Sequence, residues 1–538
     1  MSYYHCVGKN PLVYRTIGQQ LSLVANEDGD REAFVFAEEG KRITYKKLLR
    51  EADRLAAGFQ CLGLENCDRV GILSSNEPTW PIAMFAAARA GLIAVLLNTY
   101  DGIPEIEHCL RKVSAKALIA TENIGSDKLL KIISEFDPKM KKLPSLSTII
   151  VDSEKHFSGT LRLKDVMSLP SIIEINSIEE QQKDIDPHSG SSILFTSGFT
   201  GSPKGVLLSH YSLINFGHNI NRLELINFRL CIPIICGHIS SLWSTMGALC
   251  RQGTIVIPSF TIDPEKTLKV LWEEKCSFLF GMPKFMIDIL AVQKKLKLDI
   301  KNKICLTGGT HCSPELFVQL QEELGMKLKI AYGMTENCGI TFGFCPEDTE
   351  MQNNTVGCAF DHLEVKVIDS DGKLVPFGTP GELCTRGYST MIGYWEDEEK
   401  TREVLGRDGW LRTGDFFILE PNGYGKIINR LSDIIKKGNE KIFPNEIENL
   451  LGTCPKIAQA YVVGVPDEAL GEELCAFISL RDGFESFSPE ELYEFCKGKI
   501  ASSMIPRYVE IVKDFPTTPS GKVKKLELKK QFIKKESN

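Results

Sequence analysis

Near the middle of the chain, small and hydroxylated side chains follow a short apolar run. Residues 193–195 favour a buried strand, and the stretch after them contains Thr196, Ser197, Gly198, Thr200, Gly201, Ser202, Lys204 and Gly205. Free amides and hydroxyls in such a stretch can surround an oligophosphate, and the lysine adds a positive charge. Because glycine lacks a Cβ atom, the backbone can approach the ligand closely. The pattern predicts a phosphate-binding loop after a strand.

This stretch is not a Walker loop. A Walker loop has glycine before its lysine and serine or threonine after it, whereas Lys204 follows Pro203 and precedes Gly205. Considered alone, a run of glycine, serine and threonine is more often an ordinary surface loop. The phosphate interpretation therefore depends on the other motifs of the chain.

A second motif follows the predicted strand 329–331. It consists of Tyr332, Gly333, Met334, Thr335 and Glu336. An adjacent hydroxyl and carboxylate after a strand can contact a phosphate and its Mg²⁺ ion together, so Glu336 is a candidate metal ligand. The alternative is a helix N-terminus that Thr335 and Glu336 cap.

Two further motifs could hold a nucleoside. Bare backbone after the apolar run 304–306 would let a flat ring lie against the chain at Gly308, Gly309 and Thr310. Asp415 ends a Thr-Gly-Asp turn, and its carboxylate could accept both hydroxyls of a ribose. Arg430, farther along the chain, could contact the ribose or a phosphate. The alternatives are an ordinary glycine turn, a turn-capping aspartate and a surface arginine.

Two single residues complete the set of candidates. Lys522 follows a Ser-Gly pair, and a lysine on such a loop can move into a site and out of it, although most lysines near a chain end are merely solvated. His238 lies in an apolar run, where a lone histidine is more often a satisfied core residue.

The composition is that of a globular protein with more than one domain. The chain has 538 residues, of which 43% are hydrophobic and 25% charged, and its net charge of −7 gives no reason to expect a nucleic acid as partner. Arg89 and Gly91 interrupt the longest apolar run, 81–97, which predicts a core helix and a strand rather than a transmembrane segment. No secretory signal is visible, so the expected location is cytoplasmic.

The order of the elements predicts an α/β protein. Helical periodicity over 44–63 and short apolar strands keep alternating as far as residue 331, which favours layered sheets with many parallel strands. A β-rich section follows residue 360, and a small α/β unit begins after Arg430. We expect an N-terminal domain over 1–429, which includes the β-rich subdomain, and a small mobile C-terminal domain over 430–538. The seven lysines of the tail 522–535 predict either a solvated helix face or attraction to an anionic ligand.

Together these motifs resemble the AMP-forming acyl-CoA synthetases, a family of adenylating enzymes. The phosphate loop, Tyr-Gly-Met-Thr-Glu, Thr-Gly-Asp, the arginine and Ser-Gly-Lys occur in the family's order and spacing, and the resemblance extends from about Thr16 to about Lys530. Supporting stretches are Pro-Gly-Glu-Leu at 380–383 and Gly-Tyr-Trp at 393–395. The chain is most similar to a medium-chain branch of the family, whose members can be mitochondrial, and this makes the mitochondrion the alternative location.

The resemblance implies a reaction in two steps. A fatty carboxylic acid, from this branch a medium-chain one, attacks the α-phosphate of ATP, and coenzyme A then displaces AMP from the acyl-adenylate. Residues 196–204 would hold the β- and γ-phosphates, Thr335 the α-phosphate and Glu336 the magnesium ion. Gly308 to Thr310 and Tyr332 would enclose adenine, while Asp415 and Arg430 would grip the ribose. Lys522 would bridge the carboxylate and the α-phosphate, His238 would line the acyl site, and the C-terminal domain would rotate between the two steps.

Four positions depart from the family's pattern. Phe199 replaces a hydroxylated residue of the phosphate loop, Ser432 replaces the usual Asp or Lys of the hinge, and Asn439 replaces a glycine on the face that meets pantetheine. Gly237 replaces a bulkier residue and is expected to widen the acyl pocket. Two alternatives remain open: Asn439 motivates an adenylating enzyme with a different acceptor, and Phe199 motivates a weakly active or non-catalytic relative that binds ligands.

Overall fold

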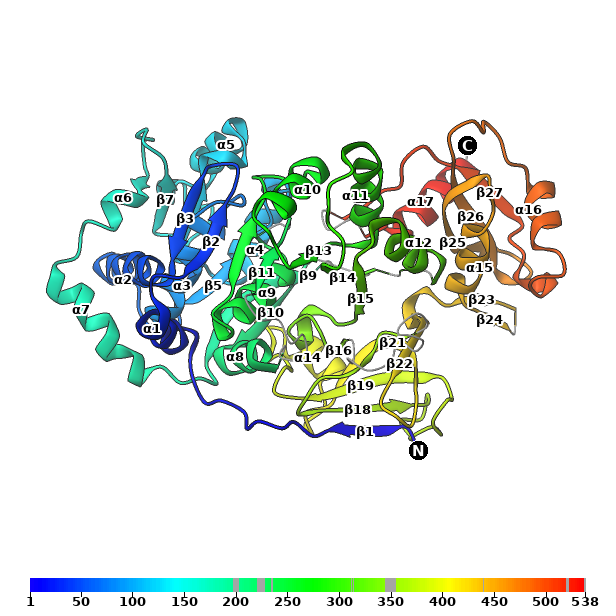
Figure 1. Ribbon diagram of the computed structural model, residues 1–538, viewed down its shortest axis with the longest axis horizontal. Coiled ribbons are helices and arrows are strands. Elements are labelled where there is room, and N and C mark those ends of the chain that lie inside the picture. Colours follow the sequence, from blue (N-terminus) through cyan, green and yellow to red (C-terminus); the bar gives the residue numbers. More distant parts are fainter. Residues whose placement is uncertain are drawn as a thin grey trace.

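Two large sheets form the body of the molecule (Figure 1). The computed structural model describes residues 1–196, 203–219, 228–233, 236–310, 312, 314–343, 355–438, 440–518 and 522–536. The first sheet has eight strands in the order β20-β10-β9-β5-β4-β6-β7-β8. These strands are β4 (Arg69–Leu73), β5 (Ile93–Leu96), β6 (Ala117–Thr121), β7 (Thr148–Asp152), β8 (Leu161–Arg162), β9 (Gly190–Thr196), β10 (Lys204–Ser209) and β20 (Gly393–Tyr394). The run from β9 to β8 is parallel, and β10 and β20 are antiparallel additions at one edge.

The second sheet has seven strands in the order β15-β14-β13-β11-β12-β2-β3, and all its pairs except β2 with β3 are parallel. Its strands are β2 (Glu32–Phe36), β3 (Lys41–Thr44), β11 (Arg229–Cys231), β12 (Thr254–Ile257), β13 (Phe278–Phe280), β14 (Ile304–Gly308) and β15 (Lys327–Ala331).

Helices cover both sheets and lie between them. The largest apolar cluster joins the inner faces of the two sheets through α1 (Ile17–Asp28), α2 (Tyr45–Cys61), α3 (Thr79–Arg89), α8 (His210–Asn219) and α9 (Ile239–Cys250). The outer face of the first sheet packs on α4 (Ile103–Lys112) and α5 (Ser126–Phe136). The outer face of the second sheet packs on α10 (Pro264–Glu273), α11 (Pro283–Leu296) and α12 (Pro314–Leu324). The α/β layering that the alternating pattern predicted is thereby confirmed.

The β-rich section forms a third, antiparallel sheet of five strands. Its order is β1 (Tyr3–Cys6), β18 (Leu363–Ile368), β19 (Gly381–Gly387), β21 (Leu411–Leu419) and β22 (Gly425–Arg430). The first strand of the chain pairs here with β18. Tyr3 lies opposite Lys366, so two segments far apart in the sequence are neighbours in this sheet. The short strands β16 (Phe342–Gly343) and β17 (Cys358–Ala359) and the helix α14 (Glu398–Val404) join this section to the body.

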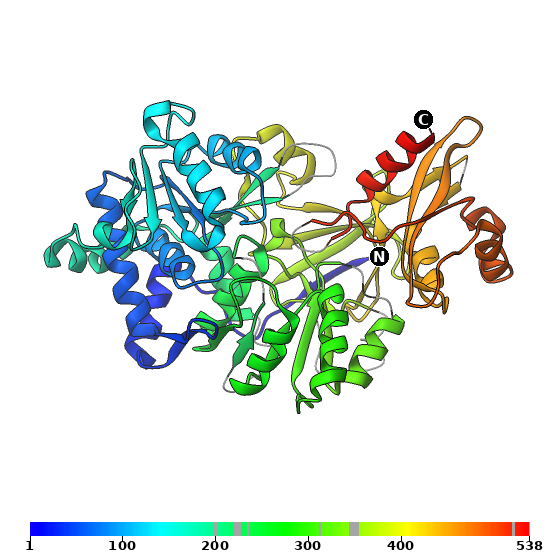
Figure 2. The same ribbon diagram turned by 90° about the horizontal axis from the view of Figure 1, so that it is seen from above.

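The C-terminal part has a sheet and a core of its own, and Figures 1 and 2 show it at one end of the molecule. Its strands are β23 (Ile435–Lys437), β24 (Glu440–Ile442), β25 (Ile457–Asp467), β26 (Gly471–Leu480) and β27 (Tyr508–Ile511), and its helices are α15 (Pro444–Gly452), α16 (Pro489–Cys496) and α17 (Lys525–Glu536). The remaining helices, α6 (Leu163–Val166) and α7 (Ile172–Gln181), lie in the N-terminal body.

The lysines of the tail pair with carboxylates of the same C-terminal part. Lys525 lies 2.7 Å from Glu448, Lys529 lies 2.7 Å from Glu472, and Lys535 lies 2.8 Å from Glu510. These ion pairs fasten α17 to the helix α15 and to the strands β26 and β27, which favours the structural interpretation of this charged helix.

The apolar run 81–97 is the helix α3 followed by the strand β5, as predicted. Among the described residues, no helix has the length and apolarity that crossing a bilayer requires. The residue that interrupts the run, Arg89, is fully buried: its guanidinium lies 2.6 Å from Asp53 and 2.8 Å from Glu179, and it donates to the Ser22 hydroxyl at 2.6 Å. One cation therefore links four helices of the core.

Replacing Arg89 with methionine is expected to destabilise the protein by about 3–5 kcal/mol, because the Asp53 carboxylate would remain in the core without its cation. Urea unfolding of the wild type and of Arg89→Met measures the change as a shift of the first unfolding transition to a lower urea concentration. The matched control is Arg54→Met on the exposed face of α2, which should stay within about 0.5 kcal/mol of the wild type. Equal stability of Arg89→Met and the control would contradict this account of the core.

Candidate active site

The predicted phosphate stretch lies between two antiparallel strands. β9 ends at Thr196 and β10 begins at Lys204, and these two residues face each other in the register. The strand predicted over 193–195 is confirmed as part of β9, whereas Lys204 and Gly205 belong to a strand rather than to a loop. Ser197, Gly198, Phe199, Thr200, Gly201 and Ser202 lie outside the described residues.

The Glu336 carboxylate lies in a turn that contacts β10. It is 6% exposed, and its Oε1 atom accepts a hydrogen bond of 2.8 Å from the Tyr394 hydroxyl. The ammonium group of Lys204 lies 4.8 Å from the centre of the Tyr394 ring. Burial, together with the neighbouring Glu336 carboxylate, raises the pKa of Tyr394 far above its usual value. The tyrosine therefore stays a neutral donor between the lysine and the carboxylate.

A buried carboxylate and a half-buried guanidinium form an ion pair at the predicted ribose position. Asp415 and Arg430 face each other on β21 and β22, and Nε of Arg430 lies 2.9 Å from Oδ1 of Asp415. The Tyr332 hydroxyl donates to the other carboxylate oxygen, Oδ2, at 2.6 Å. A carboxylate can accept about four hydrogen bonds, so the two that are formed leave capacity for a ligand hydroxyl.

Burial and charge set the ionisation of this group. Burial raises the pKa of Tyr332 well above its usual value, and the Asp415 carboxylate adds to the effect. Burial disfavours the charged form of Arg430, but Asp415 and, more weakly, Glu336 raise the pKa of Arg430 above its usual value. The Asp415 carboxylate therefore outweighs burial and keeps Arg430 charged.

Backbone packing explains the glycines of the predicted adenine position. Gly308 ends β14, and a Cβ atom there would lie 2.3 Å from the carbonyl oxygen of Ala331 on the neighbouring strand β15. Gly309 has a φ of +82°, and Thr310 follows it half-buried. The backbone therefore bends sharply at Gly309, as the alternative of an ordinary glycine turn predicted. Gly309 is exposed, which leaves room for a flat ring against the backbone.

A single turn of 3₁₀ helix over Thr335–Asn337 follows Met334. Thr335 is half-buried, and the carboxylate of Glu336 contacts Tyr394. Gly333 must be glycine, since a Cβ atom there would lie 2.3 Å from the carbonyl oxygen of Gly339. A helical turn does begin here, but its N-cap is Met334, so the alternative in which Thr335 and Glu336 cap a helix is not confirmed.

Lys522 belongs to the C-terminal part but lies within electrostatic reach of Arg430, Asp433 and Asp415. Its pKa is lowered to about 8, first by burial and then by the nearby Arg430 cation, while Asp433 and Asp415 partly oppose this shift. Its backbone N–H donates to the Thr518 hydroxyl at 3.1 Å. The structure therefore brings the lysine predicted to be catalytic and the candidate nucleotide ligands together.

His238 precedes α9 and caps its first turn. Nδ1 of the ring accepts a hydrogen bond of 3.2 Å from the backbone N–H of Ser240. A Cβ atom at Gly237 would lie 2.5 Å from the carbonyl oxygen of Leu97 at the end of β5. This glycine therefore lets two backbones touch, and the expectation that it widens an acyl pocket is not supported.

A small cavity lies beside the segment that is expected to line the acyl site. It measures about 10 Å³ and lies between α3, α9 and the second sheet. Its walls are Phe34, Trp80, Ile232, Cys236, Ser241, Ser244, Thr245, Ile255 and Ile257. Residues 234, 235, 311 and 313 and the sequence departure Asn439 lie outside the described residues.

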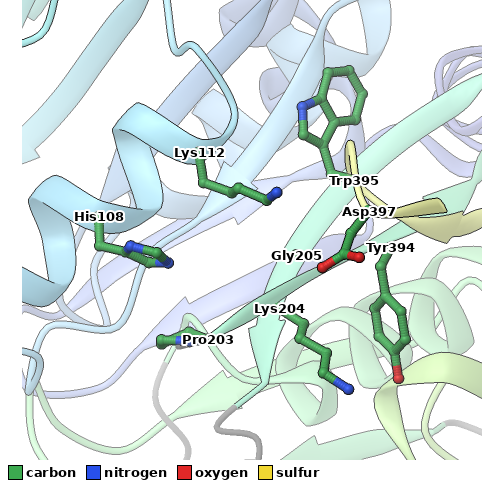
Figure 3. A pocket seen from close by; sticks show the side chains of 8 residues that line it. All are labelled: His108, Lys112, Pro203, Lys204, Gly205, Tyr394, Trp395 and Asp397. Atoms are coloured by element: carbon green, nitrogen blue, oxygen red, sulfur yellow. The ribbon is translucent and has the colours of Figure 1, made fainter. Parts of the chain in front are cut away.

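Figure 3 shows a larger pocket beside the strands β10 and β20. It measures about 140 Å³ and is lined by His108, Lys112, Pro203, Lys204, Gly205, Tyr394, Trp395 and Asp397. Lys112 donates to the carbonyl oxygen of Glu396 at 3.1 Å, and the Asp397 carboxylate caps α14. Lys204 and Tyr394 also belong to the site described above, so this pocket continues that site.

Sequence reasoning missed the contribution of Tyr394 to the site. The residue lies in the Gly-Tyr-Trp stretch, which supported the family resemblance but carried no chemical assignment. Its hydroxyl reaches Glu336 only because β20 adds to the edge of the first sheet beside β10. A tyrosine between a glycine and a tryptophan gave no signal of this contact.

Comparisons with known proteins find relatives over nearly the whole chain. The family model of the AMP-binding enzyme matches residues 21–395, and that of the AMP-binding enzyme C-terminal domain matches residues 446–522. The medium-chain acyl-CoA ligase ACSF2, mitochondrial, of Danio rerio is 37% identical over 99% of this chain and 91% of its own length. The human protein of that name is 36% identical, over 99% and 90%. The putative acyl-CoA synthetase YngI of Bacillus subtilis (strain 168) is 34% identical, over 97% and 98%.

Solved structures show the same fold. The anthranilate CoA ligase AuaEII in complex with anthranoyl-AMP superposes with a TM-score of 0.85 at 22% identity, over 98% of this chain and 99% of that one. ATP-bound MatB from Rhodopseudomonas palustris gives 0.84 at 22% identity, over 96% and 99%. Motifs, fold and relatives agree, and the chain belongs to the AMP-binding enzyme family, the AMP-forming acyl-CoA synthetases.

Proposed function

We propose that this enzyme activates a medium-chain fatty acid with ATP, through an acyl-adenylate, to an acyl-CoA thioester, and releases pyrophosphate and AMP. The observation that carries the proposal is the buried group in which Asp415 binds both Tyr332 and Arg430, with Lys522 beside it. Such a group suits a nucleotide sugar and the phosphate next to it. The names of the relatives support the choice of acid and of coenzyme A.

In the first step, the carboxylate of the acid attacks the α-phosphorus of ATP, and the bond to pyrophosphate breaks. Two anions must approach each other, so alignment and neutralisation of charge account for most of the catalysis. Asp415 and Arg430 would fix the ribose, Thr335 the α-phosphate, and residues 196–204 the pyrophosphate part. Lys522 would donate to both the carboxylate and the α-phosphate.

The residues present fit a magnesium ion. Within the described ranges, no three metal-binding side chains form a group. Glu336 is a buried carboxylate in the turn that contacts β10. Mg²⁺ in nucleotide sites is commonly held by one or two carboxylates together with the substrate's phosphates, which suits a single glutamate. When bound, the ion would neutralise phosphate charge, and Tyr394 would hold the Glu336 carboxylate in place.

In the second step, the thiolate of coenzyme A attacks the acyl carbon, and AMP leaves. For this step we propose that residues 430–538 rotate as a domain on residues 1–429 and carry Lys522 away. Ser432 lies in the short turn Leu431–Asp433 after β22, is exposed, and donates to its neighbour Asp433 at 3.0 Å. A short exposed turn between β22 and the C-terminal strands suits a hinge.

A panel of acids of increasing chain length tests the proposed function. Purified enzyme with ATP and Mg²⁺ is expected to release pyrophosphate fastest with acids of medium chain length, and to form acyl-CoA when coenzyme A is added. The measurement is coupled pyrophosphate release, with the thioester quantified by mass spectrometry. Absence of pyrophosphate release with every acid would refute the proposal and favour a non-catalytic relative.

The same panel tests a second candidate, an adenylating enzyme that transfers the acyl group to another acceptor. Asn439 motivates it, because an asparagine stands where the pattern of the family has a second glycine. Acyl-AMP that accumulates despite saturating coenzyme A would support this candidate. Rapid thioester formation would exclude it.

The proposed partners are small molecules: the acid, ATP and coenzyme A. The net charge of −7 continues to predict that nucleic acids are not among them. For the location we keep the cytoplasm as the proposal, with the mitochondrion, named for several relatives, as the alternative that cell fractionation would distinguish.

A further inference from the structure

A short exposed turn joins the C-terminal part to the body. The chain leaves β22, passes through Leu431–Asp433 and continues into β23. Rotation about such a turn moves the whole C-terminal part without breaking a strand. Contacts that lie away from the turn must therefore fix the orientation of this part.

Two aromatic rings meet across this boundary. Phe416 lies on β21 of the third sheet, and Phe443 immediately precedes α15 of the C-terminal part. The centres of the two rings are 5.3 Å apart, and the ring planes differ by 11°. Both values are those of a stacked pair, which aromatic side chains favour. The stack therefore attaches the start of α15 to β21.

A hydrogen bond lies next to the stack. Nδ2 of Asn445, in the first turn of α15, donates to the carbonyl oxygen of Ile428 on β22 at 3.0 Å. In the register of β21 and β22, Phe416 lies opposite Asn429, the residue after Ile428. The stack and the hydrogen bond therefore hold the start of α15 against one place on this pair of strands.

The same two strands carry the predicted ribose ligands. Asp415 precedes Phe416 and lies opposite Arg430 in the register. Lys522 belongs to the C-terminal part and lies within electrostatic reach of Asp415 and Arg430. The orientation that the stack and the hydrogen bond hold is thus the one in which Lys522 is near the predicted nucleotide ligands.

The two rings are separate from the cores of the parts that they join. Both side chains are half-buried. Among the described residues, the apolar clusters on the two sides of the boundary contain the neighbours Phe417 and Ile442, but neither Phe416 nor Phe443. The stack can therefore be lost while both cores remain intact.

We propose that the stack of Phe443 on Phe416 and the hydrogen bond of Asn445 hold the C-terminal part in the orientation for acyl-adenylate formation. This inference rests on the proposed function and on the domain rotation that belongs to it. The three residues are positioning residues, since they act through the place of Lys522 and not on the reacting atoms. A contact made in only one of two orientations shifts the population toward that orientation. Loss of the stack should therefore favour acyl transfer at the expense of adenylate formation.

Separate measurement of the two half-reactions tests the proposal. The first is release of pyrophosphate in a single turnover without coenzyme A, and the second is transfer from a chemically prepared acyl-adenylate to coenzyme A. Both use the best acid of the panel. In Phe443→Ala, the ratio of the first rate to the second should fall by about 10-fold, as expected for the loss of a stacked aromatic pair. In Asn445→Ala, the ratio should fall by about 3-fold, as expected for the loss of one neutral hydrogen bond.

Two further variants are the controls. Phe443→Tyr keeps a ring for the stack, so its ratio should stay within about 2-fold of the wild type. Phe484→Ala removes an exposed phenylalanine of the C-terminal part and should leave the ratio unchanged. Thermal unfolding at the wild-type temperature shows that each variant is folded.

The possible outcomes separate this inference from the proposed function. Equal slowing of both half-reactions in Phe443→Ala, or an unchanged ratio, would overturn the inference and leave the proposed function intact. If the wild type forms the adenylate but no thioester, the proposed second step is wrong, and the first rate alone tests the stack: it should fall in Phe443→Ala and not in Phe443→Tyr. If the wild type releases no pyrophosphate with any acid, the proposed function and this inference are both wrong.

Discussion

Replacing Lys522 with alanine should slow acyl-adenylate formation by about 10²–10³-fold, the usual cost of losing a positioned charge at a developing anion. The first step drives a carboxylate against a phosphate, and Lys522 lies beside Arg430 and Asp415, where both anions would meet. The measurement is pyrophosphate release at saturating ATP and acid. Transfer from a prepared acyl-adenylate should change much less, because the domain rotation proposed above removes the lysine before that step.

The pH dependence of the first step also tests the role of Lys522. Burial and the Arg430 cation lower the pKa of Lys522 from 10.5 to about 8. The ammonium form is the useful one, so activity is present below this pKa and is lost as the pH rises through it. The value of kcat/KM for ATP reports the free enzyme and should fall with an apparent pKa of about 8.

Lys524→Ala is the matched control. This lysine lies two residues farther along, is exposed, and pairs with Glu527 at 3.1 Å. Its loss should leave both the rate and the pH profile unchanged. Pyrophosphate release by Lys522→Ala at the wild-type rate would show that Lys522 is not catalytic.

Replacing Asp415 with asparagine should lower kcat/KM for ATP by about 10²-fold, since hydrogen bonds to a charged group are each worth about 1.5–3 kcal/mol. The amide cannot accept from Tyr332 and Arg430 on both sides, because one of its ends is a donor. The ribose would lose its strongest acceptor, and Tyr332 would lose the partner that holds its ring. Initial rates at varied ATP measure this effect.

The same variant should be less stable by about 2 kcal/mol in urea unfolding. Breaking a fully buried pair costs about 3–5 kcal/mol, and the side chain of Arg430 is 35% exposed, so solvent offsets part of the loss. Asp371→Asn, in the exposed turn after β18, is the control and should change neither quantity. An unchanged KM for ATP in Asp415→Asn would show that the buried group is structural and that the nucleotide binds elsewhere.

Local patterns predicted much of the fold. The periodicity over 44–63 corresponds to α2, and the apolar run 81–97 corresponds to α3 and β5. These elements depend on the spacing of apolar residues within one turn or one strand, which the sequence shows directly. The pairing of β1 with β18 could not be predicted in this way, because nothing in Tyr3–Cys6 specifies a partner several hundred residues away.

For the candidate site, too, some features were predictable from the sequence and others depend on the tertiary structure. Residue types and their order along the chain determined the family, the phosphate stretch and the identity of Asp415, Arg430 and Lys522 as candidates, because those motifs are short and contiguous. Tertiary structure alone decided which side chains meet: Tyr332 with Asp415, Tyr394 with Glu336, and Asn76 with Cys236. The lowered pKa of Lys522 also belongs to the folded state. Burial and neighbouring charge lower this pKa, and both arise only when segments distant in the chain pack together.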